Sequence, residues 1–383
     1  MAKPNAEANN LTMATLSLHE NPRLIGHTWA TGLLQSSIAA GKVSHAYIFS
    51  GPAGVGKTRL ALDFALALNC ENQPAEHQLA EQHPTGQGQQ AKGLWYCGEC
   101  RACRLIAAGK HSDVTTISLA WQALQTENQG SANANLKIDT IRAIQAEISR
   151  PPKEVAWRVY IVQDVNTMQA AAANAFLKTL EEPPTRAILI LLSDSDRTLL
   201  PTIVSRCQLI ELRAVATVTI EEALKEQGAS ELIAHTLAAL AAGRPGWALR
   251  AFQDRTHQDL NDRDEAIMQL MELLPGDRIK RMGFAEDLTK KWQEGGNKRA
   301  SIQTMLNIWL GWWRDLALVR AGLLQFLTNV DKLDDLKKQA KKLTDLQIKE
   351  MLLGITRAAA QLEGNVTPRL ALGDLFINKL PRI

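Results

Sequence analysis

The first half of the chain alternates between short, uninterrupted apolar runs and longer segments whose apolar residues recur at helical spacing. Such runs, bounded by polar residues, are typical of strands that are buried on both faces, as in parallel sheets. The helical segments between them supply the crossovers that parallel strands need. The pattern therefore predicts an α/β domain whose parallel sheet is covered by helices on both faces, with strands at 45–50, 113–117, 157–164, 187–193 and 209–212.

Only helical periodicity is found in the second half. Residues 214–256 are predicted to form a small helical lid, and 257–383 an all-helical domain. Three tryptophans lie within one turn there, and such a cluster favours helix packing or a subunit interface over a ligand site; they are Trp309, Trp312 and Trp313. We further expect a disordered polar tail at 1–20 and an α/β domain at 21–213.

Composition places the chain among ordinary globular proteins, with 45% hydrophobic and 22% charged residues over 383 positions. The net charge of +3 is too small to indicate nucleic-acid binding by itself. Neither a secretory signal pattern nor an apolar run of about 20 residues is seen, so we expect a cytoplasmic protein without a membrane segment.

Residues 51–58 match the phosphate-loop pattern G-x-x-x-x-G-K-[ST] in its strand–loop–helix setting. Backbone N–H groups of such a loop turn inward around phosphate oxygens, and the following helix adds its positive end. Lys57 is predicted to reach the outer phosphates, and the Thr58 hydroxyl to bind Mg²⁺. The pattern predicts a site able to take ATP and Mg²⁺, formed by Gly51, Gly54, Val55, Gly56, Lys57 and Thr58.

The cysteine spacing indicates a metal site. Cys97, Cys100 and Cys103 form a C-x₂-C-x₂-C run, and Cys70 lies upstream, so four thiolates can close a tetrahedral, structural Zn²⁺ site. An iron–sulfur cluster is the main alternative, although the further Cys-Pro typical of that pattern is absent. His77, His83 and His111 are possible substitute ligands, but solvated loop positions are favoured for all three, and the Gln-rich stretch 71–96 is expected to be a mobile loop.

Polar residues follow two of the apolar runs. Asp164 ends the run at 157–164 and is a candidate to hold Mg²⁺ through water, while Ser195 follows the run at 187–193. Because ligands of open parallel sheets bind beyond the carboxyl ends of the strands, Asp164 and Ser195 are expected beside Lys57.

Several of these motifs together resemble the AAA+ clamp-loader subunits of bacterial DNA polymerase III. The resemblance rests on the stretches 45–58, 68–70 with the triple-Cys run, 173–184 (ANAFLKTLEEPP), 201–207 (PTIVSRC) and 365–375 (NVTPRLALGDL). It implies an AAA+ domain with a zinc module at about 70–110, a lid, and a C-terminal collar that holds subunits in a ring. Its implied role is within the polymerase assembly, helping to load a sliding clamp onto primed DNA. The implied partners are gamma/tau-like and delta-like subunits, with clamp and DNA contacted through the complex and no membrane involved.

Residue roles follow from the same resemblance. Arg206, in Ser205-Arg206-Cys207, matches the arginine finger that enters a neighbouring subunit's ATP site, whereas a surface salt bridge is the alternative for an isolated arginine. The four cysteines at 70, 97, 100 and 103 match the family's zinc module.

Two departures from the family pattern concern hydrolysis. Hydrolysing subunits carry Asp-Glu where this chain has Gln163 and Asp164, and a neutral amide is a poor partner for Mg²⁺. Gly246 stands where the family has a sensing arginine, with Arg244 close by. We therefore expect that the loop can bind nucleotide and that the chain's own hydrolysis is weak or absent.

The main alternative is a competent ATP-hydrolysing motor subunit of the gamma/tau-like type, with Asp164 serving catalysis. Gln163 is the position that discriminates the two, because it removes a charged Mg²⁺ partner. An unrelated phosphate-loop ATPase does not explain the Ser-Arg-Cys and Leu-Glu-Glu-Pro-Pro motifs together.

Overall fold

The computed structural model describes residues 24–72, 94–119, 121–122, 135–254, 256, 258–295, 297–364 and 366–382. The chain divides into two units, Met1–Thr219 and Ile220–Ile383, and each is described by itself. The predicted tail at 1–20, most of the Gln-rich stretch, His77, His83 and Asn365 lie outside the described residues. Within the described part of the chain, no helix combines the length and apolar character needed to cross a membrane.

The first unit is built on a parallel sheet of five strands in the order β2-β3-β4-β1-β5. Its strands are β1 (Ala46–Ser50), β2 (Val114–Ile117), β3 (Arg158–Val162), β4 (Ala187–Ser193) and β5 (Gln208–Glu211). Every residue of β1, β3 and β4 is buried, as the apolar runs predict. The predicted α/β fold with a parallel sheet is confirmed, and strand ends differ from the prediction by a few residues.

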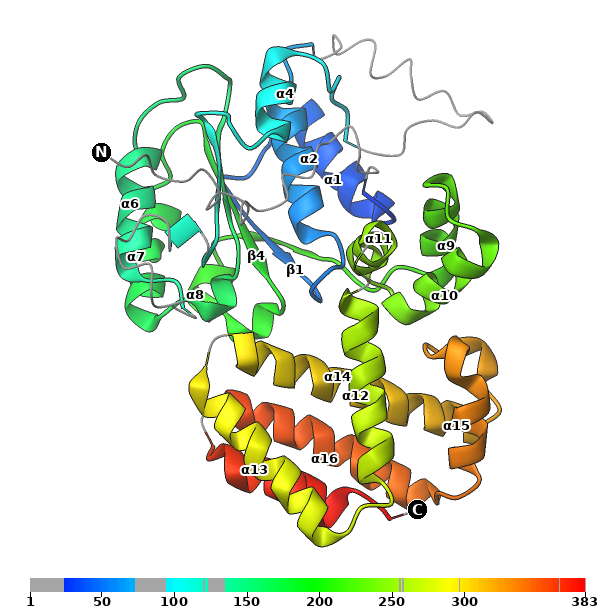
Figure 1. Ribbon diagram of the computed structural model, residues 1–383. Coiled ribbons are helices and arrows are strands. Elements are labelled where there is room, and N and C mark those ends of the chain that lie inside the picture. Colours follow the sequence, from blue (N-terminus) through cyan, green and yellow to red (C-terminus); the bar gives the residue numbers. More distant parts are fainter. Residues whose placement is uncertain are drawn as a thin grey trace, which may run out of the picture. The chain divides into compact units, whose positions relative to one another are not determined.

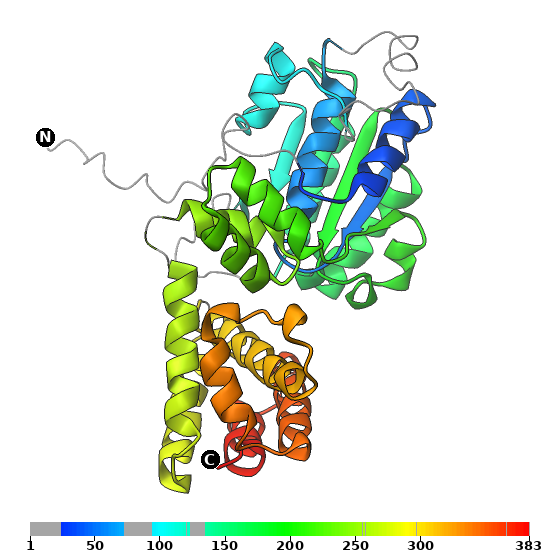
Figure 2. The ribbon, with the colours of Figure 1, turned by 90° about the vertical axis from the view of Figure 1, so that its right-hand side faces the viewer.

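Each central strand divides its side chains between two hydrophobic layers, because successive residues of a strand point to opposite faces. Tyr47 and Phe49 pack beneath α1 (Thr28–Ala39) and α2 (Lys57–Asn69). Ala46 and Ile48 pack on the other face, beneath α6 (Ile138–Ile148) and α7 (Ala170–Glu181). Figure 1 shows these two layers on opposite sides of the sheet, and Figure 2 has α1 and α2, in blue, in front of the strands. The sheet is therefore covered on both faces.

A buried ion pair ties the start of β2 to the start of β3. The Asp113 carboxylate accepts hydrogen bonds from the backbone N–H groups of Lys153 and Glu154 at 2.9 and 2.8 Å, and from the Arg158 guanidinium at 2.9 Å. Asp113 and Arg158 are both buried, and Arg158 also donates to the Glu147 carbonyl at 2.7 Å. Burial acts to raise the pKa of Asp113, but the N–H donors and the Arg158 charge outweigh it and hold the pKa below its ordinary value.

Asp113→Ala is expected to lower the free energy of unfolding by about 3–5 kcal/mol, because it leaves the Arg158 charge buried without its partner. Denaturant unfolding measures this loss. Since the folded-state pKa is depressed, the Asp113 contribution is present above the ordinary carboxyl pKa of about 3.9 and is lost as the pH falls through the lower folded value. The stability gap between wild type and variant should therefore narrow below about pH 4.

Asp139→Ala is the matched control, because Asp139 forms an exposed pair with Arg142 at 3.6 Å on α6. Its stability should change by less than about 1 kcal/mol. Equal losses in the two variants would contradict the assignment of a structural role to the buried pair.

The second unit is helical throughout its described residues. Helix α9 (Thr217–Glu226) crosses the boundary between the two units. The α-helices that come after it in the chain are α10 (Glu231–Ala241), α11 (Pro245–Gln253), α12 (Gln258–Leu273), α13 (Arg278–Glu294), α14 (Asn297–Arg320), α15 (Leu333–Ala340), α16 (Asp345–Glu363) and α17 (Pro368–Gly373). Helices α9–α11 occupy the residues predicted as the lid, and α12 onward those predicted as the collar. That the two act as separate domains stays a prediction.

The three tryptophans of α14 are fully buried in the core of this unit. The Trp309 ring packs against Phe284 and Phe376, and its Nε1–H donates to the Ala266 carbonyl at 2.7 Å. Trp312 Nε1–H donates to Gln339 Oε1 at 2.9 Å. The packing interpretation of the cluster is therefore confirmed.

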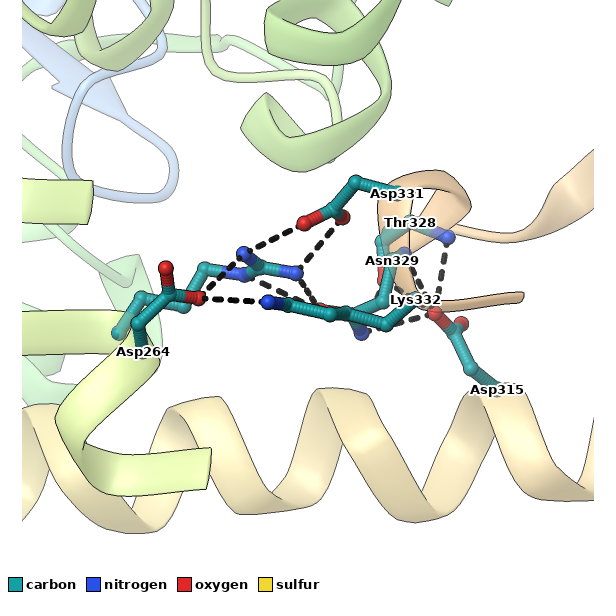
Figure 3. A network of polar contacts seen from close by, with 7 residues as sticks. Asp264, Asp315, Thr328, Asn329, Asp331 and Lys332 are labelled. Carbon is teal, nitrogen blue, oxygen red and sulfur yellow. Dashed lines mark hydrogen bonds and ion pairs between the residues drawn. The ribbon is translucent and has the colours of Figure 1, made fainter. Parts of the chain in front are cut away.

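A polar network fastens the turn after α14 to α12 and α14 (Figure 3). Buried Asp315 Oδ2 accepts hydrogen bonds from the backbone N–H groups of Thr328 and Asn329 at 3.0 and 2.7 Å. Asn329 Oδ1 accepts from the Arg263 guanidinium at 2.8 Å, and Arg263 also contacts both carboxylate oxygens of Asp331, at 2.8 and 3.0 Å. Arg263 is paired with Asp331, and Asp315 Oδ2 accepts several N–H donors, whereas Asp315 Oδ1 is buried without a partner among the described residues. These contacts hold the turn in place, which makes the network structural.

Candidate nucleotide and metal sites

The phosphate-loop motif has the predicted setting, because Gly51–Gly56 connect β1 to α2. Gly51 has a φ of +148°, and a Cβ there would lie 2.2 Å from the Leu212 carbonyl oxygen, so only glycine fits. Gly56 has a φ of +120° and precedes the first residue of α2. The glycines thus serve the close backbone turn that a phosphate cradle requires.

The segment before α1 covers this loop. A Cβ on Gly56 would meet the Leu24 side chain at 2.8 Å, and His27 Nε2 lies 3.1 Å from the Val55 carbonyl oxygen. Burial lowers the pKa of His27, opposed in part by that hydrogen bond, which favours a neutral imidazole that donates from Nε2. The loop is therefore contacted by the segment before α1 as well as by the sheet.

Lys57 is the first residue of α2 and turns its ammonium back over the loop. It donates to the Gly51 carbonyl, to the Pro52 carbonyl at 3.2 Å and to Asp194 Oδ1 at 2.7 Å. Thr58, the predicted Mg²⁺ ligand, follows it in the exposed first turn of the helix. Lys57 thus lies over the loop with its ammonium bound to acceptors within the chain, and the roles of Lys57 and Thr58 as phosphate and Mg²⁺ ligands stay predictions.

Carboxylates follow β4, which is a neighbour of β1, and β3, which is the next strand in the sheet. Asp164 follows β3 with a left-handed backbone (φ 54°), and Asp194 follows β4. Partial exclusion of water raises the pKa of the Asp164 carboxyl, and the like charge of Asp194 raises it further, while Lys57 opposes the shift. Asp164 therefore lies within electrostatic reach of Lys57, as the sequence predicts.

Ser195 is placed differently from Asp194. Its hydroxyl accepts a hydrogen bond from the Arg197 backbone N–H at 3.3 Å and so caps the short helix Asp196–Thr198. Its role as a nucleotide ligand stays a prediction. The residue that sequence reasoning missed is Asp194. An acid directly after an apolar strand is a usable signal, but the run Asp194-Ser195-Asp196 does not reveal which side chain turns toward the loop.

The four predicted cysteines gather at one place. Cys70 caps α2, Cys97 and Cys100 precede α4 (Arg101–Ala107), and Cys103 lies within it. Their sulfur atoms all lie within 4.8 Å of one another, and Cys97 Sγ and Cys103 Sγ are 4.0 Å apart. Four sulfurs at about 2.3 Å from a tetrahedral zinc are about 3.8 Å apart. The cluster is therefore close to the geometry that a single ion requires.

Backbone N–H groups point at these sulfurs. Cys97 Sγ accepts from the N–H groups of Cys100 and Glu99 at 3.3 and 3.4 Å, and Cys70 Sγ accepts from the Cys97 N–H at 3.3 Å. Burial acts to raise the pKa of Cys97, but these donors and the neighbouring thiols lower it to about 7. Such donors stabilise thiolates and orient them as metal ligands.

The segment that leads to Cys97 is anchored to two helices of the first unit. The Trp95 N–H donates to Gln35 Oε1 on α1 at 3.0 Å, and the Tyr96 hydroxyl donates to Asp63 Oδ1 on α2 at 2.9 Å. Arg59 joins the second contact, with its Nη2 3.1 Å from the Tyr96 oxygen. The module is thus part of the α1–α2 layer.

The fifth cysteine and His111 are not part of the cluster. Cys207 is outside the cluster, and burial raises its pKa to about 12, which makes it a poor thiolate. His111 is buried, and its Nδ1 accepts the Asp113 N–H at 3.1 Å. The expectation of a solvated loop histidine was therefore wrong for His111, because the turn before β2 needs an acceptor for a buried donor.

Arg206 lies between α8 (Pro201–Val204) and β5, with its side chain 36% exposed. Its Nη2 is 2.8 Å from Glu181 Oε1, and its Nη1 donates to the Thr202 carbonyl at 3.0 Å. Glu181 ends α7 within the Leu-Glu-Glu-Pro-Pro motif. Exposed pairs of this kind contribute about 0–1 kcal/mol, so the guanidinium can exchange Glu181 for another anion.

Arg244, near the position of the family's sensing arginine, is used within its own unit. It precedes α11, its Nε donates to the Ala241 carbonyl at 2.8 Å, and its guanidinium lies 5.8 Å from the centre of the Trp247 ring. Gly246 is in the first turn of α11 and has no side chain that could replace the family's sensing arginine.

The family model and the curated relatives reported below are DNA polymerase III subunits. The family model described as DNA polymerase III, delta subunit, matches residues 26–216. The delta' subunit of Pseudomonas aeruginosa is 30% identical over 250 residues, which are 64% of this chain and 67% of the relative. The delta' subunit of Bacillus subtilis is 26% identical over 87% of this chain and 90% of its own length.

Subunit tau of Bacillus subtilis is 34% identical over 55% of this chain, and the match spans only 34% of tau. A solved structure of a DNA polymerase III gamma subunit-related protein from Thermotoga maritima aligns over 91% of this chain and 99% of its own, with a TM-score of 0.38 and 18% identity.

Proposed function

Because this chain belongs to the AAA+ clamp-loader subunits of DNA polymerase III, we propose that it is the delta'-type subunit of its complex. In this role it helps to load a sliding clamp onto primed DNA, alongside gamma/tau-like and delta-like partners. The match to a delta' subunit over most of both chains supports this choice over a tau-type subunit, which shares about a third of its length.

The two residues that follow β3 support a non-motor role. Gln163 stands where a hydrolysing subunit needs a carboxylate, and the adjacent Asp164 has a raised pKa. A neutral amide and a carboxyl whose ionisation is opposed make a weak Mg²⁺ site. When bound, ATP with Mg²⁺ supplies the phosphoryl group. The end of β3 lacks the paired acids that would position this phosphoryl group for attack.

In this role the chain contributes to ATP hydrolysis at a neighbouring subunit's site. Arg206 presents a guanidinium that is partly exposed and held by a weak surface pair with Glu181. A planar guanidinium neutralises charge on a transferring phosphoryl group better than an ammonium does. In this proposal Arg206 leaves Glu181 and enters the neighbouring ATP site.

The four clustered cysteines are proposed to hold a structural Zn²⁺ ion. All four ligand positions are filled by protein, which leaves no open position for catalysis. Thiolates within 4.8 Å of one another surround a single ion, whereas a multi-iron cluster places its thiolates around several metal atoms. The ion would fasten the end of α2 to α4.

A motor subunit of the gamma/tau-like type is the second candidate, favoured by the 34% identity to tau over 221 residues. The purified full chain distinguishes the two. We expect its steady-state ATP hydrolysis to stay at background and to appear only when partner subunits are added. Rapid hydrolysis by the chain alone, lost in Asp164→Asn, would contradict the delta'-type assignment and support the motor.

A further inference from the structure

The ammonium of Lys57 is fully occupied within the chain. An ammonium has three N–H donors, and here they reach the carbonyls of Gly51 and Pro52 and the carboxylate of Asp194. The Lys57 side chain is only 11% exposed. A phosphate that is to bind Lys57 must therefore displace one of these three acceptors.

Asp194 is the acceptor that can leave. The Gly51 carbonyl belongs to a loop held against the sheet, since the Gly51 N–H donates to the Ser193 carbonyl at 3.2 Å. Asp194 is a side chain that is 59% exposed and can rotate into solvent. It also carries a full negative charge, so it resembles a phosphate oxygen more closely than a carbonyl does.

Sheet register places Asp194 at this point. Strands β1 and β4 are parallel neighbours with Ser50 opposite Ser193, so the next residue on each strand is Gly51 on one side and Asp194 on the other. An acid directly after β4 therefore lies level with the first glycine of the phosphate loop. The placement follows from the fold and does not depend on a flexible loop.

The local charge opposes a nucleotide. Asp194 contacts the Lys57 ammonium at 2.7 Å, and the charges of both residues act on the nearby Asp164 carboxyl. Burial raises the pKa of Asp164, and the charge of Asp194 raises it further, while Lys57 acts in the opposite direction. A triphosphate that enters brings further negative charge into this group, and like charges held close together oppose its binding.

We propose that the Asp194 carboxylate binds the Lys57 ammonium in place of a nucleotide phosphate and so weakens nucleotide binding. The inference rests on the proposed function in one respect, that the loop is a nucleotide site. It is independent of Arg206, which acts at another subunit's site. Nucleotide binds only by exchanging the Lys57–Asp194 contact for a Lys57–phosphate contact.

The test is ATP and ADP binding to the full-length chain, measured by titration calorimetry with Mg²⁺ and with EDTA. Asp194→Asn retains the shape and an oxygen acceptor while it removes the charge. We expect it to tighten nucleotide binding about tenfold, with and without Mg²⁺. In a Lys57→Ala background the gain should disappear, because the competition is for that ammonium.

Asp196→Asn is the matched control. It removes the same charge two residues away, from a side chain that has no contact with Lys57 among the described interactions. Its nucleotide affinity should equal that of wild type, and the melting temperatures of the free variants check that each is folded.

Two results would overturn the inference. Weaker Mg²⁺-dependent binding in Asp194→Asn would mean that Asp194 holds the metal rather than competing with phosphate. Absence of binding in both wild type and Asp194→Asn would mean that another feature blocks the site. Neither result bears on the proposed clamp-loader role, which is tested separately by ATP turnover of the assembled complex.

Discussion

Replacement of Arg206 by alanine is expected to lower ATP turnover at the neighbouring subunit's site by about 10³–10⁵-fold, the range known for arginine fingers. The variant should keep its fold, because the described contacts of the guanidinium are with exposed Glu181, the Thr202 carbonyl and the exposed Ser205 hydroxyl. Such a surface pair contributes at most about 1 kcal/mol. The effect should therefore fall on catalysis and leave assembly intact.

The measurement is single-turnover ATP hydrolysis by a reconstituted complex that contains the variant, with assembly checked by size-exclusion chromatography. Arg206→Lys should recover little activity, since an ammonium lacks the planar fork that grips two phosphoryl oxygens. Glu181→Gln should retain the finger, because it removes only the anion that holds Arg206 in the free chain.

Arg213→Ala is the matched control, from an exposed arginine just beyond β5 that pairs with Glu211 at 3.4 Å. It should leave turnover unchanged. An Arg206→Ala complex that assembles and hydrolyses ATP at the wild-type rate would exclude the finger role and leave Arg206 as a surface salt bridge.

The second large effect is expected at the cysteine cluster. Cys97→Ser removes a thiolate that several N–H groups stabilise, and we expect the protein to lose its bound zinc. Structural zinc sites in small domains contribute about 10–16 kcal/mol of binding free energy at neutral pH. In this larger unit the loss should lower the free energy of unfolding by several kcal/mol, with the segment that contacts α1 and α2 opening first.

Zinc content per chain, measured by a colorimetric chelator after denaturation, and thermal melting provide the readouts. Cys207→Ser is the control, since Cys207 lies outside the cluster, and it should keep both zinc and stability. Chelation of the wild type should reproduce the Cys97→Ser melting curve. Visible absorbance from iron in the purified protein, or full zinc content in Cys97→Ser, would contradict the proposed site.

Local patterns account for much of what could be predicted. The apolar runs became the buried strands, and the Gly-Lys-Thr turn became the start of α2, because burial pattern and turn chemistry act over a few residues. The cysteine cluster was predictable for a similar reason, since three of its ligands lie within one short turn and helix. Only Cys70, 27 positions before Cys97, had to be brought in by the fold.

Polarity alone misled the prediction at His111. A histidine in a loop next to a strand suggests solvent exposure, yet this one is buried as the acceptor for a backbone N–H of the turn. Whether a polar side chain is buried depends on which backbone donors remain unpaired around it, and this is a property of the folded chain.

The sequence by itself determined the α/β sheet, the phosphate-loop motif, the triple-cysteine run and the position of Arg206, because each depends on residues that are close together in the chain. Tertiary structure decided what these groups contact. Lys57 pairs with Asp194, 137 positions away, because β1 and β4 are neighbours in a register that sets Asp194 level with Gly51. Strand order and register arise from packing of the whole sheet, so no local pattern could show that the loop's lysine is already held by an acid.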